Sequence, residues 1–327
     1  MDWFQRLTGF PEADYDETKR RLVVRDGRLF SDVSAASCLI GHLELVALQE
    51  LRRRAESVHV TAVRPQYSET AADVAQLHRR AEYAGALFQV ASQFNLLEMT
   101  DPSVTPEDGV TRYEVDGTQG PACAIAAGPA TIWRNYFAPV GEQVGQTAAR
   151  QVDTLADVGA WLSEQLKQPV SALWAMRNGY ALCTADGLAA ISELLAAGGE
   201  AAADEIRRRL RIGVHWDVEV TNDPERPGQV VSQAFCSALP VAYSDIPAAR
   251  WRAFATVILE AAYEATLLAG FLNVRRGGSD VVLLTRLGGG AFGNHPSWID
   301  QAIDRAMSLP FPAPLAVRMV TRPRAGP

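Results

Sequence analysis

Short apolar runs alternate with longer amphipathic segments along most of the chain. Residues 281–284 are four consecutive apolar residues, the pattern of a strand that is buried on both faces of a sheet. Residues 251–269 place Phe, Ile and Ala at helical spacing on one face, which predicts a long helix. Strands that alternate with helices in this way indicate an α/β fold with a parallel or mixed sheet.

The same patterns predict the remaining elements. We expect a hairpin over residues 21–30, a strand pair or bent strand over 172–183, and strands at 58–63, 85–92, 212–221, 230–239 and 315–320. Helices are expected at 68–83, with Ser68 or Thr70 as N-cap, and at 155–166 and 186–197. Another helix is expected to end at 206–210, and a last one to begin at Pro296. The pattern of residues 42–55 fits both a strand and a helix and is left undecided.

The composition is that of a folded domain of ordinary charge. The 327 residues are 48% hydrophobic, which suffices for one large core or two smaller ones. The 31 basic and 38 acidic residues give a net charge of −7, which argues against general binding to nucleic acid. No apolar run approaches the ~20 residues that span a membrane, and the first residues lack a signal pattern. We therefore predict a cytoplasmic protein that binds neither membranes nor nucleic acids in general.

The cysteines predict free thiols rather than disulfides or a metal site. They are widely separated and form no Cys-x-x-Cys pair, which is typical of a reducing compartment. The four residues are Cys38, Cys123, Cys183 and Cys236.

One set of polar residues has a spacing that could hold a metal. His215, Asp217 and Glu219 recur at period two on a predicted strand and would share one face. The residues between them are apolar, so we favour a half-buried strand with its polar face outward. No metal and no cofactor is predicted.

The densest cluster of glycines follows the strand predicted at residues 281–284. The loop reads Leu-Gly-Gly-Gly-Ala-Phe-Gly-Asn over 287–294, and Pro296 then marks a first helical turn. Such a loop exposes backbone N–H groups to an anion near the positive end of a helix dipole. It is not a P-loop, since no Lys-Ser/Thr follows, and it lies too near the C-terminus for a dinucleotide fingerprint. We predict a phosphorylated ligand bound by Gly288, Gly289, Gly290, Ala291, Phe292, Gly293 and Asn294, while His295 either touches a phosphate or caps the helix.

In its order of elements, the C-terminal part resembles a macrodomain, the ADP-ribose-binding fold. In that family a helix leads to a buried strand, a Gly-x-Gly-(Ala/Ile)-Phe-Gly loop around the diphosphate and distal ribose, a helix and a last strand. Residues 230–320 contain these parts in that order. The resemblance implies a three-layer α/β/α sandwich with a mixed sheet over residues 81–327. Residues 1–80 would form an N-terminal extension packed on that core.

A second cluster is similar to the early macrodomain strand that ends in an Asn. Residues 88–98 read Phe-Gln-Val-Ala-Ser-Gln-Phe-Asn-Leu-Leu-Glu. The resemblance implies that Asn95 orients the distal ribose and the scissile bond, with Gln93 beside it. The glycine run that follows this Asn in the family is replaced here by Leu-Leu-Glu-Met. The alternative is that both amides only cap the end of a strand.

A third cluster, Asp-Gly-Thr-Gln-Gly-Pro-Ala at residues 116–122, contains two glycines and a proline that favour a tight turn. We interpret it as the substitute for the missing glycine run, with Thr118, Gln119 and Gly120 contacting the ligand. The alternative is a structural turn ahead of a packed helix.

Several carboxylates lie in or beside these clusters. Cleavage at the C1″ atom of an ADP-ribosyl group passes through an oxocarbenium-like state, which a carboxylate can stabilise while it activates water. A cationic leaving group such as guanidine would also be held by carboxylates. Our candidates are Glu98, Asp108 and Asp116.

The Ser-Gln-Phe-Asn and Thr-Gln-Gly-Pro stretches resemble the divergent macrodomain-type ADP-ribosylarginine hydrolases of intracellular bacterial effectors. This resemblance implies an enzyme that removes ADP-ribose from a protein side chain, with arginine favoured and ADP-ribose or an ADP-ribosylated protein as partner. Phe292 would lie against the distal ribose, and Trp133 or Tyr136 against adenine. The alternatives are a reader that binds ADP-ribose without turnover, and a hydrolase or sensor of a free ADP-ribose or NAD-derived metabolite.

Overall fold

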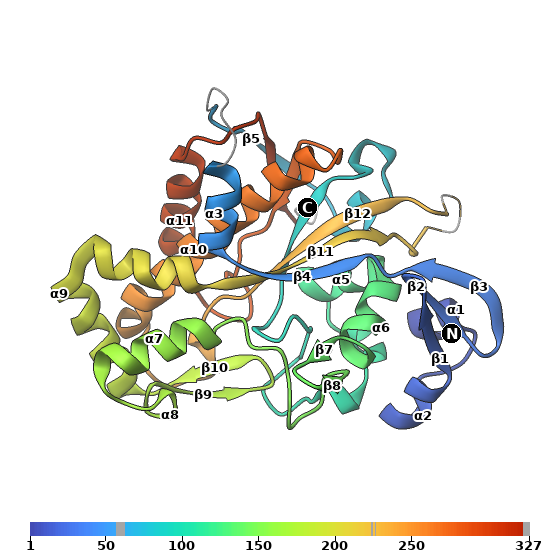
Figure 1. Cartoon of the computed structure of the whole chain (residues 1–327), viewed down its shortest axis with the longest axis horizontal. Helices are drawn as coiled ribbons and strands as arrows, with labels where there is room; N and C mark the ends of the chain where they lie inside the picture. Colours follow the sequence, from blue (N-terminus) through green and yellow to red (C-terminus); the bar gives the residue numbers. More distant parts are fainter. Residues whose placement is uncertain (57–62, 224, 226, 323–327) are drawn as a thin grey trace, which may run out of the picture.

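The centre of the protein is a seven-stranded mixed sheet with the order β4–β11–β12–β6–β13–β14–β5 (Figure 1). The computed structural model describes residues 1–56, 63–223, 225 and 227–322. β11 runs antiparallel to both of its neighbours, and the other neighbouring pairs are parallel. The strands are β4 (His42–Ala47), β5 (Gln66–Ala71), β6 (Leu87–Ala91), β11 (Arg211–Glu219), β12 (Val230–Cys236), β13 (Val281–Leu284) and β14 (Ala316–Thr321).

Alternate residues of the central strands face two helix layers. In β13, Val282 and Leu284 join the core on the side of the long helix α10, whereas Val281 and Leu283 join the core on the opposite side. The first layer contains α3 (Leu48–Glu56), α9 (Ala185–Arg209), α10 (Ala248–Arg275) and α11 (Pro296–Ser308). The second contains α4 (Val74–Arg79), α5 (Gln119–Ala126) and α6 (Gly128–Tyr136). The predicted three-layer α/β/α sandwich with a mixed sheet is confirmed.

Smaller elements pack around this sandwich. Beside α6 lie α1 (Trp3–Thr8), α2 (Tyr15–Arg20) and the small sheet of β1 (Leu22–Arg25), β2 (Arg28–Ser31) and β3 (Ser34–Leu39). An insertion after α6 contains β7 (Pro139–Val140), β8 (Gln143–Val144), α7 (Ala156–Leu166), α8 (Val170–Leu173), β9 (Trp174–Arg177) and β10 (Tyr180–Cys183). The short 3-10 turns are η1 (Ala81–Tyr83), η2 (Pro106–Asp108), η3 (Thr111–Val115) and η4 (Val241–Tyr243).

The first 80 residues belong to the central sheet as well as to the periphery. Both edge strands, β4 and β5, come from this segment, and α3 packs on α10. The boundary expected at residue 80 therefore cuts through the sheet. A segment that only packs on a core would not supply two of its strands.

The helix predicted over residues 68–83 is wrong. Gln66–Ala71 is instead the edge strand β5, which pairs with β14. The helix begins later, at Val74, with Asp73 as its N-cap in place of Ser68 or Thr70. A largely exposed edge strand carries no apolar alternation, so its pattern does not distinguish it from a polar helix face.

Most other elements are confirmed with shifted ends. The hairpin over 21–30 has Asp26 and Gly27 at its turn, and the strand pair over 172–183 is β9 and β10. The undecided residues 42–55 form a strand followed by a helix. The two helices predicted up to residue 210 are joined as α9 across a kink at Gly199, which has φ 55°. Of the strand predicted at 58–63, residues 58–62 lie outside the described residues. The four cysteines are free thiols.

The helix α10 is long and apolar enough by composition to cross a membrane. However, 83% of its apolar window is buried inside the protein. Burial of that kind is what the core helix of a three-layer sandwich requires.

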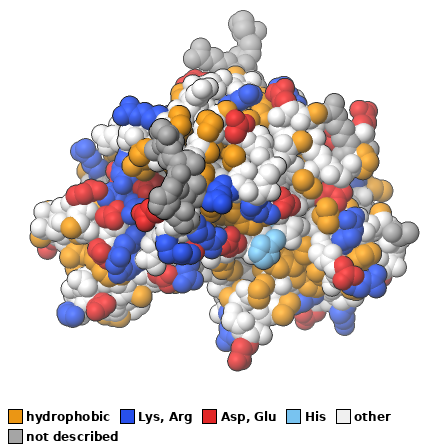
Figure 2. All heavy atoms as spheres, turned by 45° about the horizontal axis from the view of Figure 1, so that its top comes forward, with side chains coloured by type: hydrophobic (Ala, Val, Ile, Leu, Met, Phe, Trp, Pro, Cys, Tyr) orange, Lys and Arg blue, Asp and Glu red, His pale blue; other side chains and the backbone are white. Residues whose placement is uncertain are grey.

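Charged side chains of both signs are interspersed on the surface shown in Figure 2. Ion pairs also connect the helices of the first layer. Arg52 of α3 bonds Asp204 of α9 and Glu264 of α10. Arg207 of α9 is 1% exposed and pairs with Glu260 of α10.

Candidate functional site

A cavity of about 1130 Å³ opens at the carboxyl ends of the parallel strands β6, β12, β13 and β14. This edge of an open α/β sheet is the usual place for a ligand. The cavity brings together the three predicted clusters, which are far apart in the sequence, with residues of several other segments. The predicted residues that line it are Gln93, Glu98, Asp116, Thr118, Gln119, Gly120, Gly288, Gly290, Ala291 and Phe292.

The glycine loop forms one wall of the cavity. Gly288 has φ 70°, and a Cβ there would lie 2.5 Å from the Cβ of Ala238, so the position requires glycine. The backbone N–H groups of Gly290, Ala291 and Phe292 donate no hydrogen bond within the described part of the chain. Consecutive unpaired amides in a cavity wall form a site for an anion such as a phosphate.

The remaining loop residues hold this wall in place. Gly289, Gly293 and Asn294 do not line the cavity. The Asn294 side-chain amide, 3% exposed, donates to the Leu239 carbonyl oxygen at 2.8 Å. His295 does not line the cavity either, and its ring accepts from the Ser297 N–H as the N-cap of α11.

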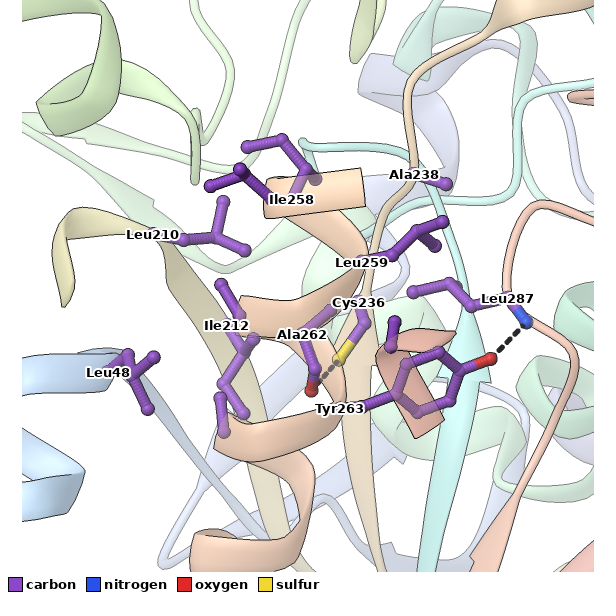
Figure 3. Close-up of a cluster of buried hydrophobic side chains, with 14 of the residues drawn as sticks. Leu48, Leu210, Ile212, Cys236, Ala238, Ile258, Leu259, Ala262, Tyr263 and Leu287 are labelled. Atoms are coloured by element: carbon purple, nitrogen blue, oxygen red, sulfur yellow. Dashed lines mark hydrogen bonds between the residues drawn. The ribbon is translucent and has the colours of Figure 1, made fainter. Parts of the chain in front are cut away.

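A tyrosine of the core helix fixes the start of the loop. The Tyr263 hydroxyl donates to the Thr285 carbonyl oxygen at 2.8 Å and accepts from the Leu287 N–H at 2.9 Å. Figure 3 shows the ring among the buried side chains of α10 and β12, with the bond to Leu287 dashed. Because Tyr263 belongs to the core, the position of the loop is set by the packing of α10 on the sheet.

Glu98 lies in another wall of the cavity and has an unsatisfied carboxyl. It is 2% exposed, and its Oε1 atom has no hydrogen-bond partner among the residues that the structure describes. Burial raises the pKa of this carboxyl well above its usual range, and Asp116 acts in the same direction while Arg134 opposes it. Burial therefore favours the protonated form of Glu98.

Neighbouring groups hold the Glu98 segment. The Glu98 N–H donates to the Tyr113 hydroxyl at 3.0 Å. The Gln93 amide bonds both backbone groups of Met99, at 2.7 and 3.1 Å, so Gln93 positions this segment although it also lines the cavity. A Cβ at Gly120 would overlap the Glu98 carboxyl, so glycine permits this close approach.

The 116–122 segment is both a cavity wall and the start of a packed helix. Asp116 accepts from the Thr118 N–H at 2.8 Å, and α5 begins at Gln119. The Gln119 amide bridges to the backbone of β6, accepting from Ala91 at 2.9 Å and donating to Gln89 at 2.8 Å. The turn ahead of a packed helix is therefore present, and its residues also line the cavity where we predict the ligand.

Two predicted catalytic residues do not line the cavity. Asn95 is fully buried, donates to Gln151 at 2.8 Å and accepts from the Leu97 N–H at 3.0 Å, which is the capping role considered as its alternative. Asp108 forms a capping box with Thr105 at η2. Both side chains stabilise the loops that carry the cavity wall.

The aromatic residues of the cavity differ from those expected. Phe292 lines it and packs against Tyr180 and Tyr243, with ring centroids 5.2 and 5.6 Å apart. Trp133 and Tyr136 do not line it, and the Tyr136 hydroxyl instead donates to Glu12 at 2.7 Å. Tyr180 and Tyr243 were missed because long-range packing of β10 and η4 brings them to Phe292.

The period-two set on β11 does not share one face. A bulge between His215 and Val218 places Asp217 at φ 54°, exposed, in an ion pair with Arg276. His215 is fully buried and Glu219 is 9% exposed, so the expected outward polar face is wrong. Among the described residues, no group of three His, Cys, Asp or Glu side chains is arranged to hold a metal ion.

The fold is similar to those of bacterial poly(ADP-ribose) glycohydrolases. No protein-family profile and no curated protein sequence matches the chain. The Thermomonospora curvata glycohydrolase is 13% identical, with 93% of this chain and 89% of that one covered and a TM-score of 0.42. A mutant Deinococcus radiodurans glycohydrolase in complex with ADP-ribose is 12% identical, with 86% and 88% covered and a TM-score of 0.44. Similarities this low do not assign an activity, so the function is inferred from the cavity itself.

Proposed function

We propose that the cavity binds an ADP-ribosyl group and that the protein hydrolyses the bond between this group and an acceptor side chain. One observation carries the proposal: unpaired backbone amides at Gly290–Phe292 and the unpaired carboxyl of Glu98 line the same cavity. The amides suit a diphosphate, and the carboxyl suits cleavage of a glycosidic bond. The cavity volume of about 1130 Å³ leaves room for a ligand of this size.

The two acids of the cavity take different roles in the proposed reaction. Glu98, whose protonated form is favoured by burial, donates its proton to the leaving atom as the bond from C1″ to that atom breaks. A water molecule attacks C1″, and the Asp116 carboxylate accepts the proton that this water loses. Transfer of that proton through solvent returns Glu98 to its starting state.

Arginine is the favoured acceptor because this part of the cavity is acidic. The carboxylates of Glu114 and Asp116 line it beside the protonated acid Glu98. A guanidinium group forms bidentate hydrogen bonds with carboxylates, whereas a phosphorylated leaving group would be repelled by them. An ADP-ribosylated arginine therefore fits this wall better than a phosphate ester does.

A reader of ADP-ribose is the second candidate. The observation that favours it is that Asn95 and Asp108, both expected to act in catalysis, lie outside the cavity. A reader would retain the amide wall and use Glu98 only as a hydrogen-bond donor to the ribose. Turnover separates the two candidates, since both predict binding.

The test is release of free ADP-ribose from peptides that carry it on arginine, serine or glutamate. We expect release from the arginine peptide at the highest rate, and no release by Glu98→Gln. Binding of ADP-ribose without release from any peptide would favour the reader. Release from serine or glutamate alone would contradict the arginine preference.

A further inference from the structure

A buried arginine behind the cavity wall has only neutral hydrogen-bond partners. Arg134 of α6 is fully buried. Its guanidinium donates to the Leu96 carbonyl oxygen at 3.2 Å, to the Thr131 hydroxyl at 3.0 Å and to Nδ1 of His215 at 3.2 Å. No carboxylate forms an ion pair with it within the described ranges of the chain. A buried charge in this state is costly unless some other group interacts with it.

The surroundings of Arg134 keep it cationic and its histidine partner neutral. The guanidinium lies over the Phe235 ring at 3.9 Å, a favourable cation–π contact. Burial lowers the pKa of Arg134 to about 10, which leaves it charged at neutral pH. Burial, with Arg134 beside it, lowers the pKa of His215 well below its usual range, so the ring can accept the hydrogen bond.

Arg134 contacts the turn that delivers Glu98 to the cavity. Leu96, whose carbonyl oxygen accepts from Arg134, has φ 64°, a left-handed conformation that is uncommon for a leucine. This turn places Glu98 two residues later in the cavity wall. The hydrogen bond from the guanidinium therefore stabilises a strained turn next to the proposed acid.

The charge of Arg134 also acts on Glu98, because it opposes the rise of the Glu98 pKa. The other described groups that interact electrostatically with Glu98 are Asp116 in the loop after η3, Tyr113 of η3, Cys123 of α5 and Tyr180 of β10. None of these four is positively charged. A negative charge formed on Glu98 would thus be balanced by Arg134.

We propose that Arg134 is a positioning residue that acts through Glu98: it holds the Leu96–Glu98 turn and stabilises the carboxylate that Glu98 becomes after it donates its proton. This inference rests on the proposed hydrolase function. When the Glu98 O–H bond breaks and the leaving atom gains the proton, the new negative charge faces the guanidinium. Reprotonation from solvent then restores the acid.

The test compares Arg134→Met and Arg134→Lys with wild type in turnover of an ADP-ribosylated arginine peptide across a range of pH. Loss of the cation makes Glu98 hold its proton to higher pH. We therefore expect Arg134→Met to move the alkaline limb of the pH profile to higher pH. Its kcat should fall by about 10²-fold, and its Kd for ADP-ribose should change less than about threefold. Arg134→Lys is expected to keep the wild-type limb and to have a measurably lower kcat, reduced by less than about tenfold.

Each result decides one question. Profiles of both variants that match wild type would overturn the role of Arg134, and so would equal losses of affinity and kcat. If Arg134→Met does not fold, the Lys variant decides: a lowered kcat with an unmoved limb supports the inference, and an unchanged kcat or a displaced limb overturns it. Wild-type protein that binds ADP-ribose without turnover would instead overturn the proposed hydrolase function, and this inference with it.

Discussion

The two walls of the cavity are built in different ways. The glycine-loop wall comes from consecutive residues, Gly288–Phe292, and offers backbone N–H groups. The acidic wall is assembled from residues 93–100 and 113–122 with Tyr180 and Tyr243, and it offers side chains. The first is one continuous loop that Tyr263 holds in position, whereas the second needs four distant segments to pack together.

This difference assigns ligand binding to the glycine-loop wall and the chemical step to the acidic wall. Backbone amides present partial positive charge without a titratable group, so the loop wall suits an anion at any ordinary pH. The acidic wall keeps the Glu98 carboxyl buried with one oxygen unpaired, which costs stability. Strain of this kind concentrates at functional sites, so variants in the two walls should have separable effects.

The largest effect is expected for Glu98→Gln. The amide keeps the size of the side chain but cannot donate a proton to a leaving atom, so kcat should fall by about 10²–10⁴-fold. Affinity for ADP-ribose should stay within about threefold of wild type. Steady-state release of ADP-ribose measures the first and calorimetric titration the second. Asp108→Asn is the matched control, since that carboxyl caps η2 outside the cavity, and turnover reduced equally in both variants would contradict the assignment.

Substitutions at Gly290 test the glycine-loop wall by adding a negative charge to it. A Cβ at this position would meet no atom within 4 Å, and its φ is not in the left-handed region. Gly290→Ala should therefore bind ADP-ribose nearly as wild type does. Gly290→Glu puts a negative charge beside the proposed diphosphate and should weaken binding by about 10²-fold or more. Equal affinities of the two variants in calorimetry would show that no anion binds here.

Tyr263→Phe should have a smaller effect on the same wall. It removes the hydroxyl that bonds Thr285 and Leu287 and leaves the ring in the core. At roughly 1 kcal/mol per lost hydrogen bond, ADP-ribose should bind about five- to thirtyfold more weakly. Tyr67→Phe, at an exposed ring on β5, serves as the control. Unchanged affinity with lowered thermal stability would mean that Tyr263 supports the core but not the loop.

The smallest effect concerns pH and stability at the acidic wall. Because the pKa of Glu98 is raised in the folded protein, the folded state binds this proton more tightly than the unfolded chain does. The resulting stability is fully present below the ordinary pKa of a glutamate and is lost as pH rises through the folded-state value. The free energy of unfolding of wild type should therefore fall relative to that of Glu98→Gln as the pH rises above the ordinary range of a glutamate. Urea denaturation measures both free energies, and a wild-type value that stays constant or rises relative to that of the variant would contradict the assignment.

The glycine-loop half of the site could be predicted from sequence because its signal is local. A buried strand, clustered glycines and a proline at the helix start lie within residues 281–296, and β13 has the predicted ends. The acidic half was predicted only in part. Glu98 and Asp116 line the cavity, but the orientation of Asn95 depends on Gln151, 56 residues away. Arg134 was missed because nothing in its local sequence indicates that it lies behind Glu98.

The strands of the fold also divide into those with a local sequence signal and those without one. The apolar runs of β6, β12 and β13 are buried on both faces and were recognised as strands. The edge strand β5 is polar and mostly exposed, and it was taken for a helix. The bulge at Asp217 reverses the faces of β11 in a way that its alternating pattern does not reveal.

The most direct test of the central claim is calorimetric titration of the intact protein with ADP-ribose, with AMP and NAD titrated alongside. A cavity in which loop amides hold a diphosphate predicts saturable binding of ADP-ribose in preference to AMP, lost in Gly290→Glu and retained in Glu98→Gln. Absence of binding to any of the three nucleotides would contradict both the hydrolase and the reader.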